Sequence, residues 1–114
     1  LFPIFKELKS KGLPLTINND GEQRRDFIHV RDVVKANILA ATNERKQDGF
    51  VYEIGTGKNY SVNEIADIFG GERVYNSGVI EPKTTRAKTH DASYLLNFNS
   101  KHLLEEWLEK WIIT

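Results

Sequence analysis

Residues 20–34 read Asp-Gly-Glu-Gln-Arg-Arg-Asp-Phe-Ile-His-Val-Arg-Asp-Val-Val, with two adjacent arginines near the centre. Side chains alternate between the two faces of an extended segment, so Arg24 and Arg25 are predicted to point in opposite directions. One of them can then face solvent while the other faces a cleft. A guanidinium presents paired N–H donors that match two phosphate oxygens, which favours an anion site here. A surface ion pair with Asp26 is the alternative that the residues leave open.

The segments on either side of this stretch predict a small α/β chain. Asn18 to Gly21 is typical of a turn, because Asn, Asp and Gly tolerate a positive φ angle. Asp32 is predicted to cap the helix that follows it, and Ser61 with Glu64 has the pattern of a capping box. The patterns predict helices from Pro3 to Gly12, at 33–43, from 62 to Gly70, at 92–96 and at 103–113, and strands at 13–17, 25–30 and 50–54. Residues 73–89 are predicted to form a long loop that can open with a short strand. No linker divides the chain, so residues 1–114 are interpreted as a single domain.

Composition excludes several classes of protein. The 114 residues include 16 basic and 16 acidic side chains, so no global positive field favours nucleic-acid binding. No apolar run approaches the roughly 18 residues of a membrane-spanning helix, so no membrane partner is expected. The absence of cysteine excludes disulfides and thiolate metal sites and favours a cytoplasmic location. The first residue is Leu1 rather than Met, which is compatible with a piece of a longer protein.

The familiar catalytic and cofactor motifs are not found in this sequence. The histidines have no carboxylate beside them at a metal-ligand spacing, and no metal site is expected. Tyr60 occupies the third glycine position of a dinucleotide fingerprint, so Gly55 and Gly57 are interpreted as turn glycines. The loop at 81–88 is basic and rich in hydroxyls, which is compatible with an anionic ligand or with a solvated surface. The spacing of Trp107 and Trp111 favours a place in the core.

The blocks of sequence described above resemble one known family. Residues 20–34 are similar to the Gly-Asp-Gly-x-Gln-x-Arg-Asp-Phe-Ile-Tyr/His-Val-x-Asp stretch of the NAD-dependent nucleotide-sugar epimerases and dehydratases, which are extended short-chain dehydrogenase/reductases. Residues 51–57 (Val-Tyr-Glu-Ile-Gly-Thr-Gly) resemble the family's Tyr-Asn-Ile-Gly-Thr-Gly. Further matches in the same order are the capped helix at 61–66, the Glu-Pro-Lys-Thr-Thr loop at 81–85 and Leu-Glu-Glu at 104–106.

The resemblance implies an α/β fold, namely the C-terminal substrate-binding domain of such an enzyme, without most of the Rossmann half. In the complete enzymes NAD and the catalytic Tyr-x-x-x-Lys belong to that N-terminal half. No catalytic or cofactor-binding residue is therefore expected here, and no NAD is expected on this chain alone. The implied partners are a nucleotide sugar and either the missing Rossmann half or a second copy. The alternative is a degenerate stand-alone module that serves protein interaction. The sugar, the nucleotide and the type of reaction stay open.

The resemblance also assigns roles to five residues. Arg25 matches the diphosphate-binding arginine, Ile17 lies in the strand that flanks the base, and His29 is expected to pack beside the pocket. Glu81 matches the acidic residue of an Arg-x-Gly-Glu loop. The arginine of that loop falls on Gly78, so Arg86 is a candidate for the second positive charge, with Lys83 as another. Asn19 stands where the family has the first glycine of Gly-Asp-Gly.

Overall fold

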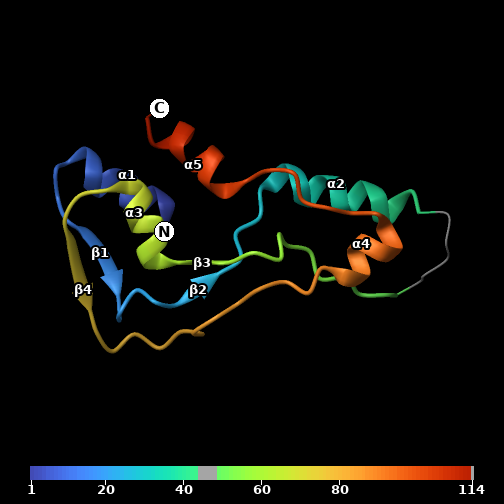
Figure 1. Cartoon of the computed structure of the whole chain (residues 1–114), viewed down its shortest axis with the longest axis horizontal. Coiled ribbons are helices and arrows are strands. Elements are labelled where there is room, and N and C mark those ends of the chain that lie inside the picture. The colour runs from blue at the N-terminus through green and yellow to red at the C-terminus, as the bar shows by residue number, and fades with distance from the viewer. Residues whose placement is uncertain (44–48, 114) are drawn as a thin grey trace.

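The computed structural model describes residues 1–43 and 49–113 and has the shape of a flat, elongated slab (Figure 1). Its elements are α1 (Phe2–Ser10), β1 (Leu15–Asn18), β2 (Arg24–Arg25), α2 (Val30–Ala41), β3 (Tyr60–Ser61), α3 (Val62–Phe69), β4 (Arg73–Asn76), α4 (His90–Leu96) and α5 (Leu104–Ile112). The radius of gyration is 16.9 Å and the extents are 52 × 32 × 16 Å. A compact chain of this length has a radius of gyration of about 13 Å. The described residues thus form an open α/β arrangement.

The first lobe is built on a parallel pair of strands. β1 pairs with β4, with Leu15 opposite Arg73, and α1, α3 and α5 pack on one side of the pair (Figure 1). Leu15 and Ile17 point into the core and alternate with exposed residues along β1. The largest fully buried side chains of the chain all belong to this core: Phe5, Phe69, Leu15, Ile17, Ile65 and Leu108. Leu108 confirms the predicted apolar face of the last helix.

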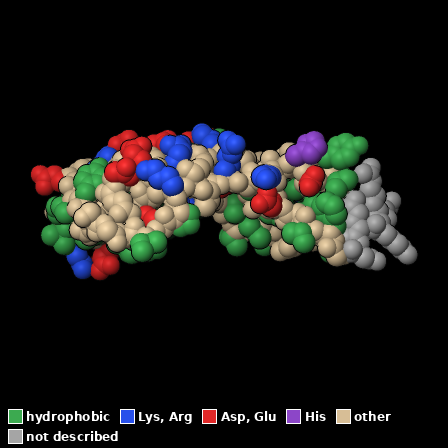
Figure 2. All heavy atoms as spheres, turned by 90° about the horizontal axis from the view of Figure 1, so that it is seen from below, with side chains coloured by type: hydrophobic (Ala, Val, Ile, Leu, Met, Phe, Trp, Pro, Cys, Tyr) green, Lys and Arg blue, Asp and Glu red, His purple; other side chains and the backbone are tan. Residues whose placement is uncertain are grey.

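The second lobe has a smaller core of its own. Buried residues of α2 and α4 and the buried Phe98 form it, with Tyr52 and Ile54 packed against them. Seen from below, two masses are joined by a narrower middle, and hydrophobic side chains are exposed on both (Figure 2). Extended segments connect the lobes, and the two buried clusters share no residue. No helix among the described residues is long and apolar enough to cross a membrane.

The capping box of Ser61 and Glu64 and the turn at Asn19 are confirmed. The Ser61 hydroxyl accepts from the Glu64 N–H at 3.0 Å, and the Glu64 carboxylate accepts from the Ser61 N–H at 3.1 Å. α3 ends at Gly70, which has a positive φ of 75°. Asn19 has a φ of 56°, a left-handed conformation that glycine adopts without strain and asparagine tolerates. This explains how Asn19 stands where the family has glycine.

The strand predicted at 50–54 is wrong. Residues 50–54 are irregular, and the strand in this part of the chain is β3, which pairs antiparallel with β2. A strand needs a neighbour for its backbone N–H and C=O groups, and none of the described strands lies beside residues 50–54. The side chains of residues 50–54 still alternate between core and solvent. Tyr52 and Ile54 pack on the second core, while Val51 is 83% exposed.

The predicted start of α2 is also wrong. The helix begins at Val30, and its N-cap is His29, whose Nδ1 accepts from the Arg31 N–H at 3.0 Å. The extended segment expected at 25–30 is therefore shorter, with only Arg24 and Arg25 in β2. Asp32 lies inside the first turn, where a carboxylate is favoured by the helix dipole. Its side chain is buried, so it serves a tertiary contact instead of the cap.

Asp32 ties the second lobe to the connection that leads into α5. Its Oδ2 accepts from the backbone N–H groups of Lys101 and His102, at 3.2 and 3.1 Å. Its Oδ1 lies 2.8 Å from the His102 Nδ1. Burial raises the pKa of Asp32, but the hydrogen bonds from His102 and Lys101 outweigh it and hold the pKa below its ordinary value of 3.8. The charged form is therefore favoured in the folded state.

The capping box makes a first prediction about stability. Ser61→Ala removes the acceptor for the Glu64 N–H, and the free energy of unfolding should fall by about 1 kcal/mol. Urea denaturation followed by circular dichroism measures this loss. Ser10→Ala is the matched control, because the Ser10 hydroxyl donates to the Glu7 carbonyl on an exposed surface and caps no N–H group. Equal stability of Ser61→Ala and the parent would contradict the cap's contribution.

Asp32 makes a prediction about acid sensitivity. A carboxyl whose pKa is lower in the folded state stabilises the fold above its unfolded pKa, and this contribution disappears as the pH falls through the folded pKa. The free energy of unfolding should therefore decrease with acidification below about pH 4, and less steeply in Asp32→Asn. Urea titrations at several pH values measure both slopes. Identical slopes for Asp32→Asn and the parent would show that Asp32 carries no such linkage.

Candidate functional site

Arg25 faces a cavity of about 360 Å³ between α1, β1 and β2. Glu81 faces the same cavity, and its Oε2 lies 3.4 Å from the Arg25 Nη2. The other carboxylate oxygen accepts from the Gln23 Nε2 at 2.6 Å. Thr16 and Asn18 add polar groups, and Phe27 lies among the apolar residues of the lining. The cavity therefore combines a cation, a carboxylate and apolar surface, which is the usual make-up of a small-molecule site.

Arg25 is the arginine that faces the cavity, whereas Arg24 contacts other side chains and not mainly solvent. Arg24 donates to the Asn59 Oδ1 at 2.9 Å and pairs with the Glu64 Oε1 at 2.6 Å, so it links β2 to the start of α3. Arg25 lies about three-quarters buried beside Glu81. The alternative of a surface ion pair with Asp26 is wrong, because the Asp26 carboxylate is directed to backbone and hydroxyl donors.

Asp26 joins three segments where the two lobes meet. Its Oδ1 accepts from the N–H and the hydroxyl of Thr56, at 3.0 and 2.7 Å. Its Oδ2 accepts from the N–H groups of Gly57 and Ala87, at 3.0 and 3.1 Å. Burial raises the pKa of Asp26, but the four hydrogen bonds outweigh it and hold the pKa below its ordinary value. Asp26 is therefore an ionised acceptor.

Gln23 carries an acceptor without a partner. The side chain is 5% exposed, and its amide nitrogen donates to the Asn18 carbonyl and to Glu81. The Gln23 Oε1 is buried without a hydrogen-bond partner. A buried acceptor in this state costs free energy, and a ligand N–H or O–H that reached it would remove that cost. The arrangement thus offers the Arg25 guanidinium to an anion and the Glu81 carboxylate to a donor on the same ligand.

The other candidate residues do not share the Arg25 cavity. Ile17 is fully buried, and it is the neighbouring Thr16 and Asn18 that line the cavity. Arg86 lies in a shallow hollow beside Asp26. Lys83 is exposed and pairs with Asp20 at 3.3 Å. The structure therefore brings Arg25 and Glu81 together and leaves Ile17, His29 and Arg86 apart from them.

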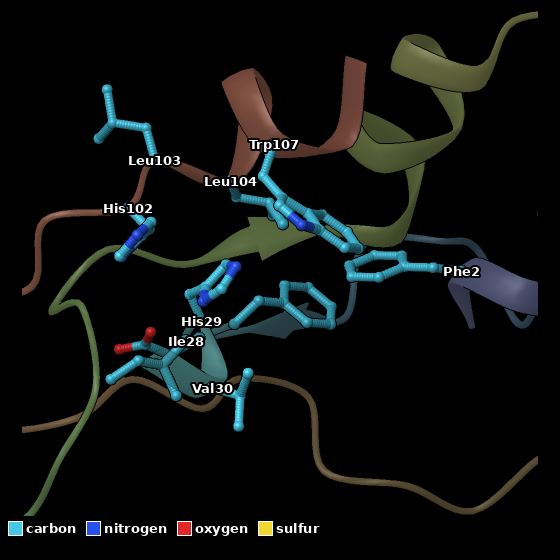
Figure 3. Close-up of a pocket in the computed structure, with 10 residues that line it drawn as sticks. Phe2, Ile28, His29, Val30, His102, Leu103, Leu104 and Trp107 are labelled. Atoms are coloured by element: carbon cyan, nitrogen blue, oxygen red, sulfur yellow. The ribbon is translucent and has the colours of Figure 1, made fainter. Parts of the chain in front are cut away.

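His29 lies in a second, largely apolar cavity of about 380 Å³ (Figure 3). Its ring stacks on that of His102 with the centroids 4.3 Å apart. Figure 3 shows the rings of Trp107, Phe2 and His29 turned toward a common space. Phe27 lines both cavities and forms a wall that they share. Within residues 1–43 and 49–113, no three His, Cys, Asp or Glu side chains come together in a group that could hold a metal ion.

Sequence reasoning missed Gln23, Thr16 and Asn18 as residues of the cavity. The signal for two of them was present. Leu15 and Ile17 are the apolar residues of a short strand, so the polar residues that alternate with them point to the other face. Gln23 carried no comparable signal, because its burial depends on the contact between the turn after β1 and the loop that holds Glu81.

Sequence comparison relates this chain to one family of known proteins. The model of the NAD-dependent epimerase/dehydratase family matches residues 2–55. A putative UDP-glucose 4-epimerase of Methanocaldococcus jannaschii is 40% identical over 79 residues, which cover 64% of this chain and 25% of the relative. A UDP-glucuronate 4-epimerase of Thermodesulfobacterium geofontis is 31% identical over 108 residues, which cover 87% of this chain and 32% of the relative.

A solved structure extends the similarity to the whole fold. The UDP-glucuronic acid 4-epimerase of Bacillus cereus, in complex with UDP-glucuronic acid and NAD, superposes with a TM-score of 0.88 at 27% identity. The match covers 98% of this chain and 39% of the epimerase. The chain thus spans between a quarter and two fifths of the length of these relatives. In sequence and in fold, the chain belongs to the NAD-dependent epimerase/dehydratase family.

Proposed function

We propose that this chain forms the nucleotide-sugar-binding part of an NAD-dependent epimerase or dehydratase. The observation that carries the proposal is the Arg25 guanidinium, which faces a cavity that Glu81 and Gln23 also line. A guanidinium suits the diphosphate of a nucleotide sugar, because its donors match phosphate oxygens. The similar Bacillus cereus epimerase is described with UDP-glucuronic acid, which is such a molecule.

The remaining groups of the cavity suit the nucleoside. Phe27 and other apolar lining residues provide a surface for a base, while Thr16 and Asn18 provide polar groups along β1. The Glu81 carboxylate is an acceptor for hydroxyl or N–H donors of the ligand, and Gln23 holds Glu81 in place through its amide nitrogen. Ile17 supports the strand from the core side, and His29 and Arg86 belong to the surroundings. In this proposal Arg25 provides the positive charge in the cavity itself.

The redox chemistry is assigned to other residues of the complete enzyme. When bound, NAD would accept and return a hydride. The sequence contains neither the dinucleotide fingerprint nor a Tyr-x-x-x-Lys motif. The described strands also form separate pairs rather than the wide parallel sheet that holds a dinucleotide. The residues present therefore do not fit NAD by themselves, and the contribution of this chain is to bind and orient the substrate.

A second part of the proposal concerns what covers the second lobe. Val30, Val34 and Ile38 recur every four residues on α2, and their side chains are between 51% and 69% exposed. This stripe and the open shape indicate that the chain packs against further polypeptide, namely the nucleotide-binding half or, for the chain alone, a second copy. The stripe is also the observation that favours the alternative function, a protein-interaction module. Loss of nucleotide-sugar binding with retained association would favour that alternative.

The proposed role of Arg25 is tested by substitution in the natural polypeptide that contains this sequence. Arg25→Ala should weaken nucleotide-sugar affinity by about 1.5–3 kcal/mol, because a charged hydrogen-bonded contact is lost. Titration calorimetry with UDP-glucose and UDP-glucuronic acid measures the change. Arg24→Ala is the matched control, because Arg24 is engaged by Asn59 and Glu64 and should leave the affinity nearly unchanged. Equal affinities of Arg25→Ala and the parent would reject the role.

The association is tested with the chain of residues 1–114. Sedimentation should show self-association that the double variant Val34→Glu/Ile38→Glu abolishes, because two charges would enter an apolar contact. Ala40→Glu is the control, since it adds a charge to an exposed position of α2 that lies off the stripe of Val30, Val34 and Ile38. A compact monomer of the parent chain at high concentration would argue against an association surface on α2.

A further inference from the structure

We propose that Asp26 is a positioning residue for the nucleotide-sugar site, because its carboxylate fixes the direction in which Arg25 points. The inference rests on the proposed function, since it concerns the same cavity. Arg25 and Asp26 are adjacent in an extended segment, so their side chains leave the backbone on opposite sides. Arg25 enters the cavity beside Glu81, while Asp26 is held by Thr56, Gly57 and Ala87. Fixing one side chain therefore fixes the rotation of the backbone that carries the other.

The position of Asp26 is set by directed contacts on both carboxylate oxygens. Each oxygen accepts two hydrogen bonds, and the donors come from residues about 30 and 61 positions further along the chain. Among the residues that the structure describes, no lysine, arginine or histidine forms an ion pair with Asp26. Its charge is stabilised by backbone and hydroxyl donors, whose positions are less variable than those of a lysine or arginine side chain.

Close packing restricts movement at the point where Asp26, Gly55 and Ala87 meet. A Cβ atom built on Gly55 would lie 2.4 Å from the Ala87 Cβ and 2.9 Å from the Asp26 Oδ2. Two neighbouring backbone contacts continue the same alignment: the Arg24 N–H donates to the Lys83 carbonyl, and the Thr85 N–H donates to the Arg24 carbonyl. The segment that carries Glu81 is thereby held alongside β2. The bond from the Ala87 N–H to Asp26 and the two backbone bonds of Arg24 together align the segments that carry Arg25 and Glu81.

The chemistry of the carboxylate makes the inference specific to Asp26. All four partners are donors, so the site requires a side chain that only accepts. In Asp26→Asn one oxygen becomes an amide nitrogen, whose hydrogens face two donors. The size of the side chain stays almost the same while the contacts on one side become repulsive. Thr56→Val is a second variant: it removes the hydroxyl contacts with Asp26 and Lys58 and keeps the three N–H groups that face Asp26.

The experiment measures UDP binding by calorimetry in the natural polypeptide that contains this sequence. Asp26→Asn should weaken binding by about tenfold or more, and Thr56→Val by a smaller factor. Asp32→Asn is the matched control, because Asp32 also accepts backbone N–H groups between the lobes but lies away from Arg25. Asp32→Asn should lower the unfolding temperature and change UDP affinity by less than about twofold. A merely structural role of Asp26 would instead make the affinities of Asp26→Asn and Asp32→Asn change alike.

A second measurement separates this inference from the proposed function. The Nε–H resonance of Arg25, assigned by its loss in Arg25→Lys, reports the order of the guanidinium without any ligand. Asp26→Asn and Thr56→Val should shift or broaden it, whereas Asp32→Asn should leave it in place. The inference would be overturned if Asp26→Asn and Thr56→Val both fold and both leave the Arg25 resonance unchanged. It would also be overturned if both fold and both leave the UDP affinity unchanged. Failure of the parent to bind UDP would overturn the proposed function, and the resonance would still decide the role of Asp26.

Discussion

Two carboxylates, the half-buried Asp26 and the buried Asp32, hold the connections between the lobes, and the rest of the arrangement depends on them. Asp26 joins β2 to residues 55–57 and 87, and Asp32 joins α2 to residues 101 and 102. The hydrophobic cores lie on either side of this middle and share no buried residue. Apolar packing stabilises each lobe, but hydrogen bonds to an ionised acceptor are directional and determine how the segments cross.

The two lobes have separate hydrophobic cores and different roles in the proposed function. The first lobe has the larger core, and its buried β1 residues leave Thr16 and Asn18 facing the cavity of Arg25. The second lobe has a small core and an exposed apolar stripe on α2. A rigid support under the cavity suits substrate orientation, whereas an unpaired helix face suits packing against further polypeptide.

Sequence reasoning succeeded where a few neighbouring residues determine the structure. The capping box of α3 and the turn at Asn19 depend on contacts between residues close in the chain. The opposite directions of Arg24 and Arg25 follow from the alternation of side chains in an extended segment. Family resemblance led to the correct family, because blocks of residues in a fixed order carry that information without knowledge of the contacts.

The errors arose where distant segments decide the outcome. Residues 50–54 have the alternation of a strand, but the described chain provides no neighbour for their backbone. Asp32 has the side chain of a good cap, but burial against residues 101 and 102 engages it elsewhere and leaves the cap to His29. Local sequence propensity gives no information about a hydrogen-bond partner that lies about seventy residues away in the chain.

The sequence by itself determined the family, the positions of most helices and the guanidinium that the proposed site requires. Only the tertiary structure decided that Glu81 and Gln23 meet Arg25, that His29 belongs to a separate cavity and that Asp26 faces four donors. The physical reason is that helix signals act within one or two turns of the chain. A cavity, in contrast, is made by side chains whose approach depends on the packing of the entire first lobe.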